Sequence, residues 1–430
     1  MSQADWDRFQ YYSRKVKVFR VIDTDDPQIH PSTYLRMAQL QSSSESLFPS
    51  LRHLDYTLDD RSTSEASHIF LFLSPLLESL GLFHIGGFEN TISAFLDTLS
   101  SQAQMVSRIA LRFGQMSVDI FKTSIIHFEQ LRSLELFDAV FMSDFVLWEV
   151  LGTLPSLENL TLTINPDCHP AHDSEKSNGQ TRSGVTKYFY ALENLLVVGS
   201  FFLIQHLLSY IDSPCLKSIK VFPINDSHTA PEREDFFTPS MKIVASKWSR
   251  SLKTLVIGPW SSDIAHHNII SKCLILLRVL HEMQTFNLMG WRMENVENMD
   301  GDMRRLVMSW PKLRSLRLPL NQTHISLLTL RIIAENCPEL RHLQIRLNTS
   351  TIPPFDASKS LRHKLEVLTV GRAHPPDSVT QTMQEYQIQV TQYLDFIFPY
   401  LKPIEVQPKD EIWSSIRNLV KLCQDARRRK

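Results

Sequence analysis

The sequence is poor in glycine, in cysteine and in net charge, and each shortage argues against a class of protein. Its 430 residues include only 12 glycines, which disfavours loops that wrap closely around phosphate groups. The five cysteines are scattered and form no CxxC pair, so a disulfide framework is not expected and a reducing compartment is. The formal net charge is −1 at pH 7, which gives no sign of a nucleic-acid surface or an anionic-membrane surface.

Long hydrophobic runs are missing as well. The most apolar stretch, LLVVGSFFLI (195–204), has about half the length needed to cross a bilayer. The N-terminal MSQADWDRFQYYSRKVKVF lacks the apolar core of a signal peptide. We therefore expect a cytoplasmic protein with no membrane partner, and the basic end ARRRK (426–430) leaves nuclear entry as an alternative.

Motifs for catalysis and metal binding are also lacking. The sequence contains no GxSxG, GxxxxGK, HExxH or dinucleotide-binding fingerprint. Cys168, His169 and His172 come nearest to a metal cluster, but the second half of a structural zinc module is missing. We predict no catalytic residues, no metal site and no cofactor.

What the sequence does contain is a repeat, L-x-x-L-x-L, with apolar first, fourth and sixth positions. The twelve copies begin at Leu51, Leu77, Val106, Leu131, Leu157, Leu192, Leu216, Leu252, Met283, Leu313, Leu340 and Leu365. They span 314 residues over eleven intervals, a mean period of about 28.5. The second position is charged in ten of the twelve, and proline stands two residues before the first position in six, which chance does not explain. A weaker copy begins at Val16.

Each copy predicts one strand followed by one helix. In a strand, the fourth and sixth positions point to one side and the third, fifth and seventh to the other. Helical spacing follows in 89–102, with Asn90 as its cap, and in 323–336. The predicted apolar faces of these helices are Ile92, Phe95, Leu96 and Leu99 in the first, and Ile325, Leu328, Ile332 and Ile333 in the second. One copy cannot bury its apolar faces alone, but stacked copies can.

This unit resembles a leucine-rich repeat, and NCPELRHLQI (336–345) is similar to the repeats of F-box proteins. The segments ADWDRFQYYSRKVKVF, LFPSLRHL and YLDFIFPYLKP…WSSIRNLVKLCQDARRRK resemble fungal, particularly basidiomycete, F-box/leucine-rich-repeat proteins. The resemblance implies the substrate-binding part of an F-box-type ubiquitin-ligase receptor. Only about fifteen residues precede the first candidate strand and none resembles an F-box, so binding to the adaptor and cullin subunits is not expected.

The predicted fold is an α/β leucine-rich-repeat solenoid, with a curved parallel sheet on the concave face and helices on the convex face. Residues 1–48 are expected to form an N-terminal cap or a first irregular repeat, and 49–372 the repeats. Residues 373–430 are expected to form a C-terminal cap of two helices, at 379–398 and 409–427, with a basic tail.

The concave face is the expected site of binding for a protein substrate or peptide. Seventh positions would form a rim of Phe83, Phe137 and Phe222, continued by Trp260 and Trp291, unless these rings complete the core beneath the loops. Basic and polar residues gather toward the C-terminal copies, where an arginine fork would select an acidic or phosphorylated peptide if the face is not simply solvated. These residues are Arg317, His342, Gln344 and Arg346.

Two other functions stay open. One is a leucine-rich-repeat scaffold or inhibitor unrelated to ubiquitin. The other is a regulator of small GTPases that inserts an arginine, although nothing singles out one arginine for that task.

Overall fold

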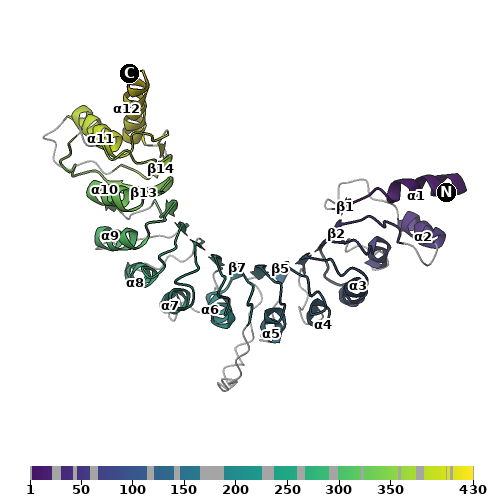
Figure 1. Ribbon diagram of the computed structural model, residues 1–430. Coiled ribbons are helices and arrows are strands. Elements are labelled where there is room, and N and C mark those ends of the chain that lie inside the picture. Colours follow the sequence, from purple (N-terminus) through teal and green to yellow (C-terminus); the bar gives the residue numbers. More distant parts are fainter. Residues whose placement is uncertain are drawn as a thin grey trace, which may run out of the picture. The chain divides into compact units, whose positions relative to one another are not determined.

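The computed structural model places the chain in two compact units. It describes residues 2–21, 31–41, 46–58, 66–113, 121–139, 146–164, 188–224, 237–258, 267–289, 299–320, 324–356, 360–373, 382–402, 404–406 and 410–429. The first unit comprises Met1–Ser200 and Ser209–Leu216, and the second comprises Phe201–Leu208 and Lys217–Lys430. Both are built from parallel strands with helices along one side of the sheet (Figure 1).

In the first unit, the described strands pair in the order in which they occur in the chain. They are β1 (Val18–Val21), β2 (His53–Thr57), β3 (Ser79–Phe83), β4 (Arg108–Arg112), β5 (Ser133–Ala139), β6 (Asn159–Ile164) and β7 (Asn194–Gly199). The helices are α1 (Gln3–Ser13), α2 (Pro31–Leu40), the 3-10 helix η1 (Ala66–Phe72), α3 (Glu89–Gln102), α4 (Phe121–Ile125) and α5 (Val146–Gly152). Helices α3, α4 and α5 lie on the same side of these strands (Figure 1).

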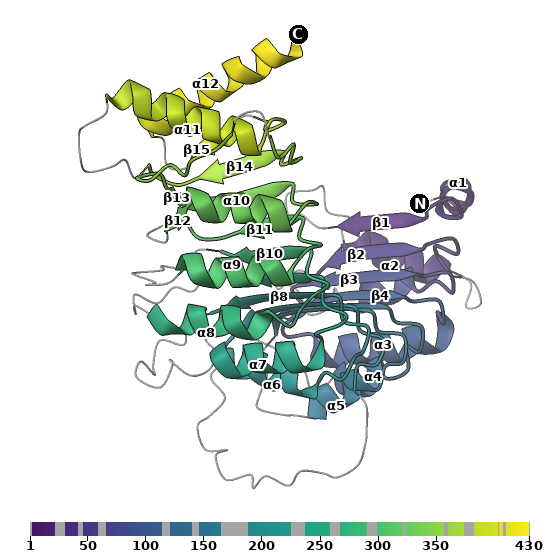
Figure 2. The same cartoon turned by 60° about the vertical axis from the view of Figure 1, so that its left-hand side comes forward.

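In the second unit, the strand order is β8-β9-β10-β11-β13-β14-β15, and β12 pairs with β13. The strands are β8 (Ser218–Pro223), β9 (Thr254–Ile257), β10 (Thr285–Leu288), β11 (Ser315–Arg317), β12 (His324–Ser326), β13 (His342–Asn348), β14 (Val367–Val370) and β15 (Glu405–Val406). The helices are α6 (Phe201–Tyr210), α7 (Phe237–Lys247), α8 (His267–Leu277), α9 (Met299–Ser309), α10 (Leu327–Asn336), α11 (Met383–Ile397) and α12 (Glu411–Arg428). Helices α8, α9 and α10 stack one above another (Figure 2).

The pairing register of the strands confirms the repeat. In the first unit His53 lies opposite Ser79, and Ser79 lies opposite Arg108. In the second unit Ser315 lies opposite His342. All are third positions of their copies, so neighbouring strands align in the phase predicted from the leucines. The weaker copy is confirmed too, because β1 pairs with β2 in the same phase. The fold is an α/β leucine-rich-repeat solenoid.

Burial alternates along the strands as the pattern predicts. In β13, Leu343 and Ile345 are at most 1% exposed, whereas His342 is exposed and Gln344 and Arg346 are half-buried. Each leucine buried in this way contributes about 1.5–3 kcal/mol of hydrophobic stabilisation. The side of each unit's sheet that carries the third, fifth and seventh positions is called the open face below.

A turn precedes each strand whose copy has proline two residues before its first position. The Leu51 amide donates to the Phe48 carbonyl at 3.1 Å across Pro49, and the Leu340 amide donates to the Cys337 carbonyl at 3.0 Å. Proline suits the second position of such a turn because its φ is fixed and its missing N–H removes no strand hydrogen bond. The prediction of a proline turn into the strand is confirmed.

The predictions for the helices at 89–102 and 323–336 agree with the structure to different degrees. Helix α3 buries its predicted face, with exposures of at most 2% for Ile92, Phe95, Leu96 and Leu99. The prediction of Asn90 as its cap is wrong, because the N-cap residue is Phe88 and no side chain caps the helix.

The predicted start of the second helix is also wrong. The Ser326 side chain accepts a hydrogen bond from the Thr329 amide and caps α10, which therefore begins at Leu327. Ile325 belongs to β12 instead, and Leu328 is 42% exposed. The serine cap was the signal in the sequence that marked this boundary.

The two helices predicted near the C-terminus are confirmed as α11 and α12. Between them lies β15, which pairs with β14. Its copy of the pattern, Leu401, Ile404 and Val406, was missed, and it forms only two strand residues. Among the residues that the structure describes, no helix is long and apolar enough to span a membrane.

His363, in the turn before β14, makes stability depend on pH. Its ring is 6% exposed, and its Nδ1 atom accepts a hydrogen bond from the Leu365 amide at 3.0 Å. Nε2 lies 2.9 Å from the Cys337 carbonyl oxygen, so this nitrogen carries the proton of the neutral ring. Burial lowers the pKa of His363, and the hydrogen bond to Cys337 opposes the shift only in part.

We therefore expect the His363 contribution to stability to be complete above about pH 6.5, the ordinary histidine pKa. It is lost as pH falls below that value, because the unfolded chain then binds a proton that the folded ring resists. The free energy of unfolding should fall between pH 7.5 and 5.5, and the fall should be smaller in His363→Asn, whose side-chain oxygen can still accept from the Leu365 amide. Urea denaturation at each pH measures this. An equal pH dependence in the two proteins would contradict the assignment.

Candidate functional site

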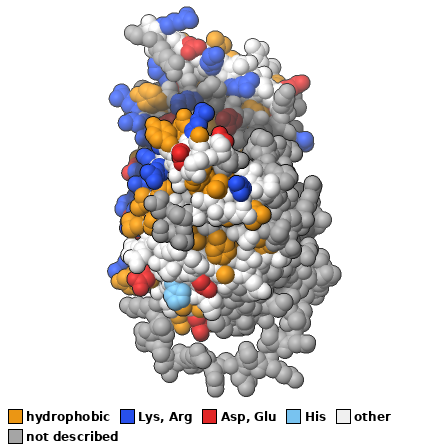
Figure 3. Space-filling view, turned by 90° about the vertical axis from the view of Figure 1, so that its right-hand side faces the viewer, with side chains coloured by type: hydrophobic (Ala, Val, Ile, Leu, Met, Phe, Trp, Pro, Cys, Tyr) orange, Lys and Arg blue, Asp and Glu red, His pale blue; other side chains and the backbone are white. Residues whose placement is uncertain are grey.

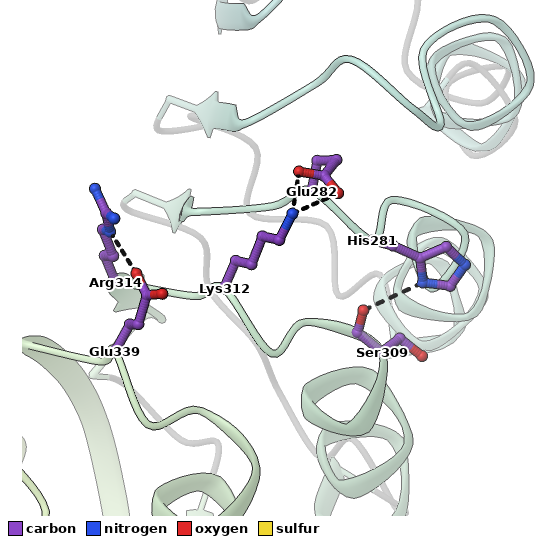
Figure 4. A network of polar contacts seen from close by, with 6 residues as sticks. All are labelled: His281, Glu282, Ser309, Lys312, Arg314 and Glu339. Atoms are coloured by element: carbon purple, nitrogen blue, oxygen red, sulfur yellow. Dashed lines mark hydrogen bonds and ion pairs between the residues drawn. The ribbon is translucent and has the colours of Figure 1, made fainter.

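The amino-terminal edge of the strands carries charges that are paired between consecutive copies. Figure 4 shows two such pairs in the second unit, Lys312 with Glu282 at 2.7 Å and Arg314 with Glu339 at 2.9 Å. Beside them, His281 Nδ1 lies 3.3 Å from the Ser309 carbonyl oxygen. Glu366 contacts both Lys402 and Arg341, and these two cations, Lys402 first, lower the pKa of its carboxyl group. Exposed pairs of this kind add little stability. The charges in these pairs are balanced within the chain.

On the open face of the first unit, the arginines are paired in the same way. Arginines occupy third, fifth or seventh positions of β1 and β4 in its described part, and each meets a carboxylate of the next copy. The pairs are Arg20 with Asp55 at 3.0 Å, Arg108 with Glu135 at 2.9 Å, and Arg112 with Asp138 at 2.9 Å. The charges of these arginines are therefore balanced by carboxylates of the same unit.

The open face of the second unit is different. Arg317 and Arg346 lie on it, and Arg372 follows β14 directly after Gly371. None of the three arginines makes an ion pair with another described residue. The nearest carboxylate in the row, Glu405, instead accepts a hydrogen bond from the Thr369 hydroxyl at 3.0 Å. Among its described residues, the second unit therefore presents three arginines that no carboxylate pairs with.

Arg346 is held in place by a glycine in the neighbouring copy. A Cβ atom on Gly371 would lie 3.2 Å from Arg346 Cγ and 2.7 Å from the Leu320 carbonyl oxygen. The close Leu320 carbonyl requires glycine at this position, and the space that glycine leaves also accommodates the arginine stem at the end of β14. The Nε atom of Arg346 is buried and has no hydrogen-bond partner. Burial first, and then the positive charge of Arg372, lower the pKa of the Arg346 guanidinium.

Phe222 lies against a glycine in the same way, four copies earlier in the second unit. It occupies the seventh position of its copy, and a Cβ atom on Gly258, the seventh position of the next, would overlap its ring. A large side chain thus leans over a glycine of the following copy twice in this unit. Phe222 is half-buried, as are Phe83 and Phe137 on the open face of the first unit. Whether these rings bind a partner stays a prediction.

The structure brings several predicted residues together on neighbouring strands. Arg317 lies opposite Gln344 across β11 and β13. The Gln344 amide donates to the Leu318 carbonyl at 3.3 Å, while Arg317 and His342 are exposed. Trp260 and Trp291 lie outside the described residues, as do Cys168, His169 and His172.

Arg372 and Gly371 were missed by the sequence prediction. The signal for them was a glycine at the seventh position of the copy that follows an arginine at the same position. An arginine directly after that glycine completes the group.

Two buried cysteines offer no nucleophile at neutral pH. Burial raises the pKa of the Cys273 and Cys337 thiols to about 12. The reactive thiolate form is therefore scarce at both positions. The Cys337 thiol instead lies 3.5 Å from the Trp310 carbonyl oxygen, inside the core between two copies.

Exposed apolar side chains distinguish the candidate site less clearly than its charged side chains do. On the face seen in Figure 3, hydrophobic side chains lie in small groups among basic and acidic ones. Leu76 and Met105 of the first unit are 44% and 62% exposed, as scattered surface residues commonly are. The unpaired arginines of the second unit are the more specific feature.

Comparison with known proteins gives a likeness of fold. No protein-family model matches the sequence, and no curated protein matches it. A chain of the yeast Rad7 and Elc1 complex is 15% identical, with 95% of this chain and 90% of that chain covered and a TM-score of 0.41. A protein from Bacteroides fragilis is 14% identical, with 59% and 68% covered and a TM-score of 0.36. A Leptospira interrogans LRR protein is 13% identical, with 91% and 100% covered and a TM-score of 0.30. At these values the likenesses carry no functional argument.

Proposed function

We propose that this chain is a non-catalytic protein-recognition solenoid whose partner binds the open face of the second unit. The observation that supports this most directly is the set of arginines there without carboxylate partners, when their counterparts in the first unit are paired. Charged groups that a protein leaves uncompensated on an ordered surface favour association with a complementary partner. The strands fix these side chains at regular spacing, which lowers the ordering cost of binding.

The sequence resemblance supports a finer assignment within this proposal. It favours the substrate-binding part of an F-box-type ubiquitin-ligase receptor, working in the cytoplasm or the nucleus. The alternative is a scaffold or inhibitor unrelated to ubiquitin. Depleting the protein from cells separates them: a receptor's bound partner should accumulate, whereas the abundance of a scaffold's partner should not change.

A matched pair of charge reversals tests the recognition surface. Arg317→Glu changes the open face of the second unit, and Arg305→Glu makes the same charge change on helix α9, where Arg305 is exposed. Full-length wild-type protein and both variants are used as bait, and bound proteins are quantified by mass spectrometry. We expect Arg317→Glu to lose a reproducible subset of partners by at least about tenfold, roughly 1.4 kcal/mol of binding free energy.

The Arg305→Glu variant should retain that subset. Thermal melting of both variants checks that each is folded, which exposed substitutions of this kind should allow. If both variants capture the wild-type set in wild-type amounts, the open face of the second unit is not the binding surface.

A further inference from the structure

Arg346 and Arg372 form a pair of like charges at the carboxyl ends of two neighbouring strands. Resting on the proposed function, we propose that this arginine pair binds the phosphate group of a phosphorylated side chain in the partner. The first step is geometric. Strands β13 and β14 are adjacent, and the Gly371 amide donates to the Ile345 carbonyl at 3.4 Å. Gly371 thus sets Arg346 beside the start of the segment that carries Arg372.

The second step concerns the hydrogen bonds of Arg346. Its guanidinium is forked and planar, with donors that match the oxygens of a phosphate. Its Nε atom is buried yet donates to no described residue. The Nε atom is shielded from solvent, so the donors that a ligand oxygen can meet are the terminal Nη atoms, which are not among the buried unpaired atoms and have no partner among the described residues.

The third step is the charge balance. Arg372 lies close enough for its charge to act on Arg346. Asp410 accepts hydrogen bonds from the Ala373 and Trp413 amides rather than from either guanidinium group. Glu405 accepts from Thr369, and Glu366 pairs with Lys402 and Arg341. Among the described residues, neither Arg346 nor Arg372 makes an ion pair with a carboxylate. Keeping them together is unfavourable until an anion arrives.

The fourth step selects the ligand. A phosphorylated serine or threonine carries about −1.5 to −2 charge at pH 7, which balances two arginines, whereas a carboxylate balances one. Binding of single-stranded nucleic acid depends on aromatic rings on which bases stack. The third, fifth and seventh positions of β11, β13 and β14, all described, hold no Phe, Tyr or Trp. These observations favour a phosphopeptide over an oligonucleotide.

Fluorescence polarisation with defined probes tests the proposal on the full chain. The probes are a degenerate peptide library with a fixed phosphoserine, the same library with serine or glutamate there, and a single-stranded oligonucleotide of equal length. We expect wild-type protein to bind the phosphoserine library at least about tenfold more tightly than the serine library. Arg346→Gln and Arg372→Gln should each lose most of that preference, and Arg305→Gln on α9 should keep it.

Gly371→Ala adds a test of geometry. Its new methyl group would meet the Leu320 carbonyl oxygen as well as the Arg346 side chain, so it should displace both and weaken phosphoserine binding while leaving both arginines present. Thermal melting checks that this variant is folded. Arg346→Gln should melt no lower than wild type, because it relieves like-charge repulsion; a lower melting temperature would mean that Arg346 serves the fold and would overturn the proposal.

Equal affinity for the phosphoserine and serine libraries would also overturn it, as would tighter binding of the glutamate library or of the oligonucleotide. Failure here is distinguishable from failure of the proposed function. If phosphopeptide binding is absent but Arg317→Glu still loses partners that Arg305→Glu keeps, recognition by the open face stands and only the phosphate site falls.

Discussion

Replacing Leu343 with aspartate should unfold the copies around β13, while the same replacement one residue later, Gln344→Asp, should leave the protein folded. Leu343 is 1% exposed on the buried side of the strand. Removing a core leucine costs about 2–5 kcal/mol, and an unpaired carboxylate there adds several more. The total exceeds about 4 kcal/mol, a large part of the stability of a typical domain.

Gln344 is the matched control because it lies on the opposite face of the same strand. It is half-buried and loses one hydrogen bond, to the Leu318 carbonyl at 3.3 Å, which is worth about 0.5–1.5 kcal/mol. Urea denaturation followed by circular dichroism measures both variants. Similar losses from Leu343→Asp and Gln344→Asp would mean that burial does not alternate along β13 as described.

The contrast between Leu343 and Gln344 illustrates what the sequence could predict well, which is the side of the sheet on which each strand residue lies. The leucines recur with one phase through the chain, so a single rule for strands assigns each position to a face. The register of His53 with Ser79 and of Ser315 with His342 follows from aligning the copies. Repetition supplies many independent instances of the same prediction, and random errors in single copies cancel.

Features that occur once were harder to predict. The short strand β15 has only two residues, and its copy of the pattern lies between two helices in the part predicted as a helical cap. At α10, the apolar residues from Ile325 onward looked like a continuous helical face. The Ser326 cap starts the helix later and turns Leu328 outward. Local hydrogen bonds decided these boundaries, and apolar periodicity does not report them.

The residue types at the candidate site could be predicted from the sequence, but which of its arginines form ion pairs could not. The sequence shows arginines and carboxylates mixed at open-face positions, and it predicts a face of mixed charge. Which arginine reaches a carboxylate depends on contacts between copies. Arg108 reaches Glu135, whereas Arg346 leans over Gly371 toward another arginine. The difference between a satisfied and an unsatisfied surface therefore appears only with side-chain positions.

Trp310→Ala should destabilise the second unit by about 3–5 kcal/mol, the range for deleting a large aromatic side chain from a core. Trp310 is fully buried in the turn before β11, and its ring meets Phe286 edge to face at 5.1 Å between centroids. Its Nε1 atom donates to the Leu277 carbonyl at the end of α8, 3.3 Å away. One side chain thus joins a helix and two strands from consecutive copies, so its loss opens a cavity that neither copy can fill alone.

Two further variants separate these contributions and control for the loss of an aromatic ring. Trp310→Phe keeps most of the packing and loses only the hydrogen bond to the Leu277 carbonyl, which still accepts from the Leu280 amide at 3.1 Å, so it should cost less than Trp310→Ala. Tyr400→Ala removes a ring that is 59% exposed in the same unit and should change the free energy of unfolding by less than about 0.5 kcal/mol. Urea denaturation of the three variants orders them. If Trp310→Ala cost no more than Tyr400→Ala, the contacts of Trp310 would not be holding consecutive copies together, since in a stacked array such shared side chains supply the interface energy between neighbours.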